Sequence, residues 1–184
     1  KKGFIMERKD QLKRLTDEFH EMKEKGNLDQ SSEATARTWI EELLKIFGWN
    51  TKNPFEIDQE YHLTSSAKKN LKKIESTHSR PDYVFKKGKQ LLQYLDAKKI
   101  SVNIEQSRES AFQIRSYGWS TGLPCSIVSD FEEFAVYDCR YKPSDSDKPD
   151  VARVRHLMYF DYVDNFDFLN EHLSRELLYS GRLF

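Results

Sequence analysis

The sequence has few cysteines and glycines and lacks a long apolar run. Its two cysteines, Cys125 and Cys139, make a poor disulfide framework and fit a reducing cytosol. Neither has a Cys-x-x-Cys partner or a nearby histidine pair, which argues against structural zinc. No apolar run approaches the roughly 18 residues needed to span a bilayer, and no secretory signal pattern opens the chain. These absences predict a cytoplasmic protein with no membrane partner.

Common nucleotide-binding and nucleophile motifs are also missing. The seven glycines form neither a P-loop nor a Gly-x-Ser-x-Gly elbow. Asn53-Pro54-Phe55 looks superficially like the Asn/Asp-Pro-Pro-aromatic motif of adenine methyltransferases, but it lacks the second proline and a preceding Gly-rich strand end. The histidines show no metal-binding spacing; they are His20, His62, His78, His156 and His172.

The composition that remains is typical of one soluble globular domain with a real core. Hydrophobic residues make up 38% and charged residues 33% of the 184 positions. The 30 basic and 30 acidic residues cancel, but local fields matter more for nucleic-acid binding than the total charge. Each basic cluster taken alone is most simply a solvated surface. These clusters are Lys68-Lys69, Lys72-Lys73, Lys86-Lys87, Lys89 and Lys98-Lys99.

Apolar periodicity and turn residues predict a mixed sheet covered by helices, an α/β (α+β) fold. The helices are expected at 6–25, 33–47 and 104–117, with a C-terminal helix marked by Tyr162, Phe166, Leu169 and Leu173. The strands are expected at 55–63, 82–85, 91–98, 125–129, 134–137 and 152–160, with a hairpin turn at 86–89, a turn at 130–133 and a loop at 143–150. The polar stretch 64–78 reads as a loop or a short helix.

Charged residues follow directly on the buried strand Leu91–Leu95. Successive strand side chains alternate faces, so Asp96 and Lys98 share one face and Ala97 points away. Asp82 begins the neighbouring hairpin strand, at the end away from the turn. Two carboxylates and one ammonium can therefore converge there, and hard oxygen donors suit Mg²⁺. The alternative is a structural ion pair between Asp96 and Lys98 or Lys99.

Two predicted helices carry polar residues at positions that could face the charged strand end. Glu33 lies on the apolar stripe of its helix, three positions before Ala36, where the helix dipole explains an acid but not its face. Gln113 and Tyr117 are four residues apart and share a face of their helix, which also fits a polar rim with a half-buried tyrosine.

Together these residues resemble the PD-(D/E)XK nuclease superfamily. The matching order is a helix acid, Pro81-Asp82, Asp96-Ala97-Lys98 and the Gln-x-x-x-Tyr pattern of 113–117. The segments "SEATARTWIEELLKIFGWN", "QIRSYGWSTGLPCSIVSDFEEFAVYD" and "YVDNFDFLNEHLSREL" are similar to the N-terminal nuclease region of type IIG restriction-modification enzymes and to type I restriction subunits. The resemblance covers about residues 31–181. Residues 1–30 match none of the family's motifs and are expected to form an N-terminal helix, whereas the resemblance implies a restriction-endonuclease-like nuclease domain at 31–184. Asp96 replaces the more frequent Glu, which the superfamily tolerates.

The resemblance implies a bacterial-type, magnesium-dependent endonuclease that cleaves double-stranded DNA, with Mn²⁺ able to substitute. Its metal ligands would be Asp82, Asp96 and the Ala97 carbonyl, and its catalytic residues Asp82, Asp96, Lys98, Glu33 and Gln113, with Glu33 at a second metal or its water shell. The expected DNA contacts are Lys86, Lys87, Lys89, Lys99 and Tyr117, although Tyr117 also fits a packing or backbone contact.

The resemblance also implies a wider assembly. Methyltransferase and target-recognition regions are expected on the same longer chain, and a transient dimer is expected for double-strand cleavage. The alternatives are a catalytically inactive nuclease-fold module that binds DNA or serves as a scaffold, and a type I restriction subunit domain.

Overall fold

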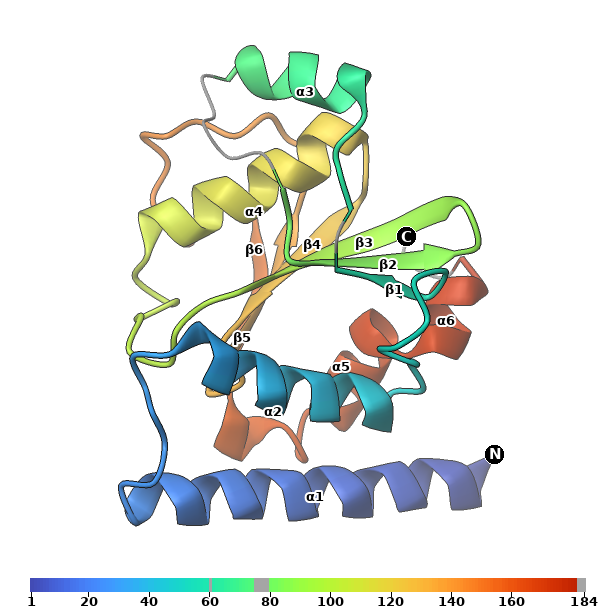
Figure 1. Cartoon of the computed structure of the whole chain (residues 1–184), viewed down its shortest axis with the longest axis vertical. Coiled ribbons are helices and arrows are strands. Elements are labelled where there is room, and N and C mark those ends of the chain that lie inside the picture. The colour runs from blue at the N-terminus through green and yellow to red at the C-terminus, as the bar shows by residue number, and fades with distance from the viewer. Residues whose placement is uncertain (60, 75–79, 182–184) are drawn as a thin grey trace.

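The computed structural model describes residues 1–59, 61–74 and 80–181 and contains one six-stranded sheet between two layers of helices (Figure 1). The strands are β1 (Ile57–Asp58), β2 (Tyr83–Lys87), β3 (Gln90–Ala97), β4 (Cys125–Ser129), β5 (Glu133–Asp138) and β6 (Arg153–Met158). The helices are α1 (Lys2–Glu24), α2 (Glu33–Ile46), α3 (Ser65–Lys72), α4 (Arg108–Thr121), α5 (Phe166–Leu173) and α6 (Arg175–Tyr179), with a 3₁₀ turn η1 at Tyr159–Asp161.

The sheet is open and mostly antiparallel. Its spatial order follows the chain from β1 to β6, and the β3–β4 pair is parallel while the other four pairs are antiparallel. A parallel pair requires a crossover, and α4 supplies it. This arrangement confirms the predicted mixed α/β fold and is consistent with the restriction-endonuclease-like fold that the resemblance implies.

The two faces of the sheet carry separate cores because neighbouring strand residues alternate between them. Tyr83 and Phe85 belong to the core under α1, α2, α5 and α6, whereas Val84 and Tyr94 belong to the core under α3 and α4. Asp96 follows Tyr94 by two residues and therefore belongs to the α4 side. The charged end of β3 thus lies where both helical layers can reach it (Figure 1).

Helix α1 is packed into the larger core, although no motif was assigned to residues 1–30. Leu12, Leu15 and Phe19 are buried together with residues of the sheet. Arg8 is buried and pairs with Glu176 of α6 at 2.9 Å. Across the three described stretches, no helix is both long enough and apolar enough to cross a membrane.

Several predicted boundaries were wrong for local reasons. Among the described residues of the strand expected at 55–63, only β1 forms, because the Asn53 carbonyl accepts the N–H groups of Glu56 and Ile57 in a tight turn; residue 60 lies outside the described residues. The third helix begins at Arg108 instead of residue 104, since the Ser107 hydroxyl caps it by accepting from the Ser110 N–H at 3.1 Å.

The stretch 64–78 contains the short helix α3, which is one of its two predicted forms, and its part at 75–78, with His78, lies outside the described residues. Two other segments differ from their predicted form. Strand β2 extends through Lys87, so the hairpin turn narrows to Gly88-Lys89. The C-terminal helix is two short helices, α5 and α6, and Tyr162 precedes both.

Helix α4 approaches the sheet closely at Gly118, the residue after Tyr117. A Cβ placed there would lie 2.6 Å from Cys139 Cβ and 2.7 Å from Ser126 Oγ. Both neighbours are buried and belong to the sheet side of the α4 contact. Glycine at this position therefore sets the depth of α4, and with it the position of Gln113 and Tyr117.

We expect Gly118→Ala to lower the free energy of unfolding by about 1–3 kcal/mol, because an added methyl group overpacks a filled core. Urea unfolding followed by circular dichroism measures this. Gly3→Ala is the control, since a Cβ there meets nothing within 4 Å. Equal stability of the Gly118→Ala protein and the unmodified protein would contradict the close approach.

Candidate active site

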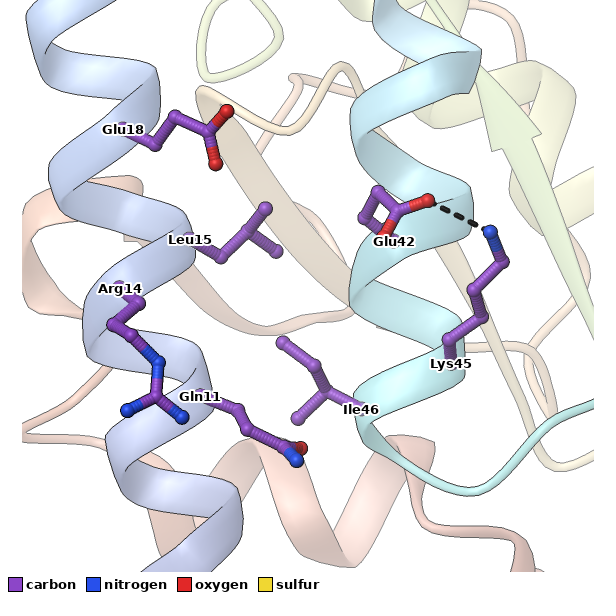
Figure 2. Close-up of a pocket in the computed structure, with 7 residues that line it drawn as sticks. All are labelled: Gln11, Arg14, Leu15, Glu18, Glu42, Lys45 and Ile46. Carbon is purple, nitrogen blue, oxygen red and sulfur yellow. Dashed lines mark hydrogen bonds and ion pairs between the residues drawn. The ribbon is translucent and has the colours of Figure 1, made fainter.

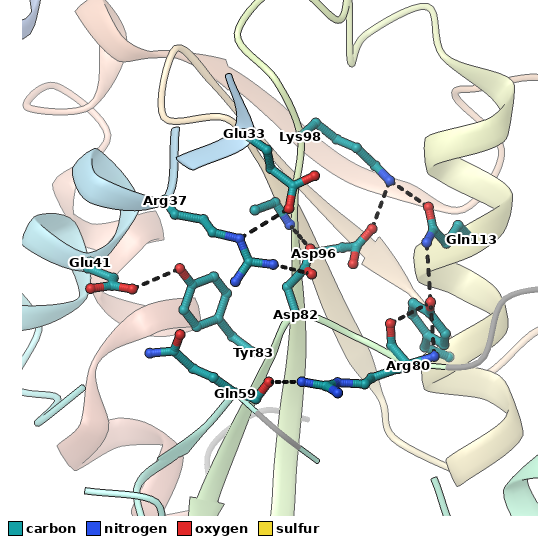
Figure 3. A network of polar contacts seen from close by, with 12 residues as sticks. Glu33, Arg37, Glu41, Gln59, Arg80, Asp82, Tyr83, Asp96, Lys98 and Gln113 are labelled. Atoms are coloured by element: carbon teal, nitrogen blue, oxygen red, sulfur yellow. Dashed lines mark hydrogen bonds and ion pairs between the residues drawn. The ribbon is translucent and has the colours of Figure 1, made fainter. Parts of the chain in front are cut away.

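The two predicted carboxylates meet where β2 begins and β3 ends. Tyr83 pairs with Leu95 across the antiparallel hairpin, so the residues just outside these positions face each other. Asp82 Oδ2 accepts a hydrogen bond from the Ala97 N–H at 2.8 Å. Lys98 Nζ lies 2.8 Å from Asp96 Oδ2. The structure therefore brings Asp82, Asp96 and Lys98 together, as the strand phase predicts (Figure 3).

Asp96 is the most buried member of this group, with a side chain only 3% exposed. Its pKa is raised to about 7, because burial and the adjacent Asp82 charge, which raise it, outweigh Lys98, which lowers it. Two carboxylates this close in a poorly solvated position repel each other when both are ionised. The position therefore favours a cation.

Helix α4 fixes the lysine from the opposite side. Gln113 Oε1 accepts from Lys98 Nζ at 2.5 Å, and Gln113 Nε2 donates to Tyr117 Oη at 3.2 Å. Tyr117 Oη in turn donates to the Arg80 carbonyl at 2.7 Å, just before Asp82. The Gln-x-x-x-Tyr pattern is thus a chain of hydrogen bonds that ties Lys98 to the segment carrying Asp82 (Figure 3).

Tyr117 is not available as a DNA contact in this structure. Its side chain is 1% exposed, and its hydroxyl is bonded to the backbone of Arg80 and to Gln113. The predicted nucleic-acid role was wrong for this residue, because the helix face it shares with Gln113 is turned into the core. The alternative, a packing and backbone contact, is what the structure shows.

Arg37 is a further site residue that the sequence reasoning missed. Its guanidinium forms an ion pair with Asp82 Oδ1, and its Nε lies 3.1 Å from Glu33 Oε1 (Figure 3). The same guanidinium lies over the Tyr83 ring, 5.3 Å from its centroid. Burial lowers its pKa, but the charges of Asp82 and Glu33 outweigh that and raise it. The spacing of four residues from Glu33 was the available signal.

The donor set at this strand end fits a magnesium ion. Asp82, Asp96 and the Ala97 carbonyl offer hard oxygen atoms, and Mg²⁺ typically binds one or two carboxylates and keeps several waters. Within residues 1–59, 61–74 and 80–181 no group of three or more His, Cys, Asp or Glu side chains could hold a metal ion. Glu33 therefore does not join the two aspartates in this arrangement, because Arg37 lies between Glu33 and Asp82.

The predicted DNA-contacting lysines do not all lie near the carboxylates. Lys86 Nζ pairs with Asp58 at 3.4 Å, and Lys87 Nζ donates to the Tyr179 carbonyl at 3.3 Å. These two and Lys89 are at the turn end of the hairpin, opposite the end that carries Asp82. Lys99 is exposed and directly follows Lys98, so it is the member of the set closest in the chain to the site.

A groove of about 500 Å³ between α1 and α2 is a separate feature (Figure 2). Leu15 and Ile46 form its apolar part, and Glu42 pairs with Lys45 at its edge. It contains none of the predicted site residues. Its lining comprises Gln11, Arg14, Leu15, Glu18, Glu42, Lys45 and Ile46.

The raised pKa of Asp96 predicts a pH-dependent stability in the absence of metal. A carboxyl with a folded-state pKa above its unfolded value stabilises the fold below about pH 4, and this contribution is lost as pH rises through about 7. Asp96→Asn cannot ionise, so we expect its advantage over the unmodified protein to grow from pH 4 to pH 8. Thermal unfolding in a chelating buffer measures this. A constant difference across that range would contradict the burial of an ionisable Asp96.

Comparison with known proteins finds a restriction enzyme that is similar to nearly the whole chain. The chain is 33% identical over 184 aligned positions to the type II restriction enzyme and methyltransferase RM.Eco57I of Escherichia coli. The similarity covers 96% of this chain, so it includes most of α1, but only 18% of that relative. No family model matches, and no solved structure is recognisably similar. The chain is a distant homologue of one segment of a restriction enzyme that is also a methyltransferase.

Proposed function

We propose that this chain is a magnesium-dependent DNA endonuclease domain of the PD-(D/E)XK type, acting within a type IIG restriction-modification enzyme. The convergence of Asp82, Asp96 and Lys98 at one strand end carries this proposal. The similarity to RM.Eco57I supports it, because that protein is a restriction enzyme. The reaction is hydrolysis of a DNA phosphodiester bond.

Asp82, Asp96 and the Ala97 carbonyl would hold Mg²⁺ in this proposal, and Mn²⁺ would fit the same oxygen donors. When bound, such an ion polarises a phosphoryl oxygen and lowers the pKa of a water molecule. Lys98, fixed between Asp96 and Gln113, orients the attacking water and stabilises negative charge that develops on the phosphate. Gln113 positions Lys98, and the Ala97 N–H orients Asp82.

A non-catalytic DNA-binding module is the second candidate, and one observation favours it. Arg37 already neutralises Asp82, so the site holds together without a metal ion. The complete set of Asp82, Asp96 and Lys98 favours the enzyme, because a site that has lost its activity usually loses one member.

The wider assembly is inferred from the coverage of the relative. The chain spans 18% of RM.Eco57I, whose name includes a methyltransferase. We propose that methyltransferase and target-recognition regions accompany this domain in one polypeptide. A helicase motor in their place would instead indicate a type I restriction subunit. Cleavage of both DNA strands requires two such sites, which would meet in a transient dimer.

We expect Asp82→Asn or Lys98→Ala to reduce magnesium-dependent plasmid cleavage by the intact protein at least about a hundredfold. The asparagine keeps an oxygen that accepts from the Ala97 N–H, so folding and methylation should persist. Exposed residues of the 143–150 loop and its edge provide the controls, Asp145→Asn and Lys142→Ala, which should cleave normally. Undiminished cleavage by Lys98→Ala would refute the assignment.

The chain on its own should bind duplex DNA weakly and without sequence preference. Non-specific binding typically has a dissociation constant of about 10⁻⁴ to 10⁻⁶ M at physiological salt. Because binding releases counterions, the affinity falls steeply as the salt concentration rises. Each lysine that contacts a phosphate, such as Lys99, should reduce the salt slope by about one when replaced by alanine. Fluorescence anisotropy with two unrelated duplexes at several salt concentrations measures this. Tight binding to only one duplex would place sequence recognition in this chain.

A further inference from the structure

Both oxygens of the Asp82 carboxylate are already engaged in this structure. Oδ2 accepts the Ala97 N–H at 2.8 Å, and Oδ1 forms the ion pair with Arg37. The Ala97 bond comes from the main chain at the end of β3 and is fixed by the sheet. The Arg37 contact comes from a long side chain that is 29% exposed, so it is the contact that can break.

A divalent cation bound by the two aspartates would be repelled by the Arg37 guanidinium. Each carboxylate oxygen keeps a second lone pair, but a guanidinium held on the same carboxylate would repel the metal ion at short range. Metal binding at Asp82 therefore requires Arg37 to leave Oδ1.

After Arg37 leaves Asp82, its other contacts can hold it beside the site. Its Nε lies 3.1 Å from Glu33 Oε1, one helical turn earlier on α2, and its guanidinium lies over the Tyr83 ring. Tyr83 is itself held in place, because its hydroxyl donates to Glu41 Oε1 at 3.1 Å. The released guanidinium thus keeps an anion and an aromatic face beside the site.

We propose that Arg37 is a positioning residue that occupies Asp82 in place of the metal ion and is displaced when the ion binds, with Glu33 as its retaining anchor. This inference rests on the proposed function, since it presumes a metal ion at Asp82 and Asp96. It gives Glu33 a different role from the one expected from the resemblance, which places Glu33 at a second metal ion or its water shell. Glu33 holds Arg37 and does not contact the ion.

Because Arg37 occupies Asp82, the unmodified protein should bind the metal ion less tightly than a variant that lacks this arginine. Apparent affinity falls in proportion to the fraction of molecules in which Asp82 is open. A partly exposed ion pair is typically worth up to about one kcal/mol, so Arg37→Gln should bind the ion more tightly, by up to about fivefold. Damage to the fold would instead weaken binding.

Mn²⁺ binding to the purified chain, followed by the electron paramagnetic resonance signal of the free ion, tests this without any cleavage reaction. Lys99→Gln is the matched control, because it removes one positive charge from an exposed residue at the same strand end. It should change the affinity less than Arg37→Gln does. Thermal unfolding without metal confirms that each variant is folded.

Glu33→Gln separates the anchor role from the ligand role. As an anchor, Glu33 affects the metal only through Arg37, so its replacement should change affinity in the unmodified background and have little effect beside Arg37→Gln. As a ligand, it should weaken binding equally in both backgrounds, which would overturn the inference.

Two further outcomes distinguish a failure of the proposed metal-dependent function from a failure of the proposed displacement of Arg37. If the unmodified chain binds no Mn²⁺ and Asp96→Asn makes no difference, the proposed metal-dependent function fails. If the unmodified chain binds Mn²⁺ through Asp96 and Arg37→Gln binds it no more tightly than Lys99→Gln does, the function stands and the displacement of Arg37 is refuted.

Discussion

Two carboxylates held together at a poorly solvated strand end repel each other, and the surrounding structure compensates for this repulsion. Asp96 is buried at the end of β3, and Asp82 is fixed against it by the Ala97 N–H. Asp96 belongs to β3, and Asp82 directly precedes Tyr83, which pairs with Leu95, so the sheet holds the two residues beside each other. The stability of this region therefore depends on positive charge supplied by other parts of the chain, or by an ion.

That positive charge comes from both faces of the sheet. Lys98 follows Asp96 in the chain and is held by Gln113 of α4, whereas Arg37 reaches Asp82 from α2 on the other side. The site lies between the two helical layers, each of which has its own core. Gly118 lets α4 approach the sheet, so packing far from the carboxylates sets the geometry of the lysine.

The alternation of strand side chains was enough to predict that Asp96 and Lys98 share a face and that Asp82 lies beside them. The Gln113–Tyr117 spacing predicted a shared helix face but not its direction, which burial in the α4 core decides. The spacing of Arg37 from Glu33 indicated their pairing, but the contact of Arg37 with Asp82 could not be predicted, because it depends on how α2 is rotated against the sheet. The sequence predicts that the lysines lie on the hairpin turn, but it does not predict which other segment the turn contacts. The contact of Lys87 with the Tyr179 carbonyl is seen only in the three-dimensional structure.

The central claim is that the strand end formed by Asp82, Asp96 and Ala97 is a metal site. A crystal of the chain soaked in Mn²⁺, measured for anomalous scattering, tests it most directly. The account predicts a single strong peak about 2.0–2.3 Å from one oxygen each of Asp82, Asp96 and the Ala97 carbonyl. A peak bound elsewhere, or no peak with both aspartates ordered and still paired to Arg37 and Lys98, would contradict it.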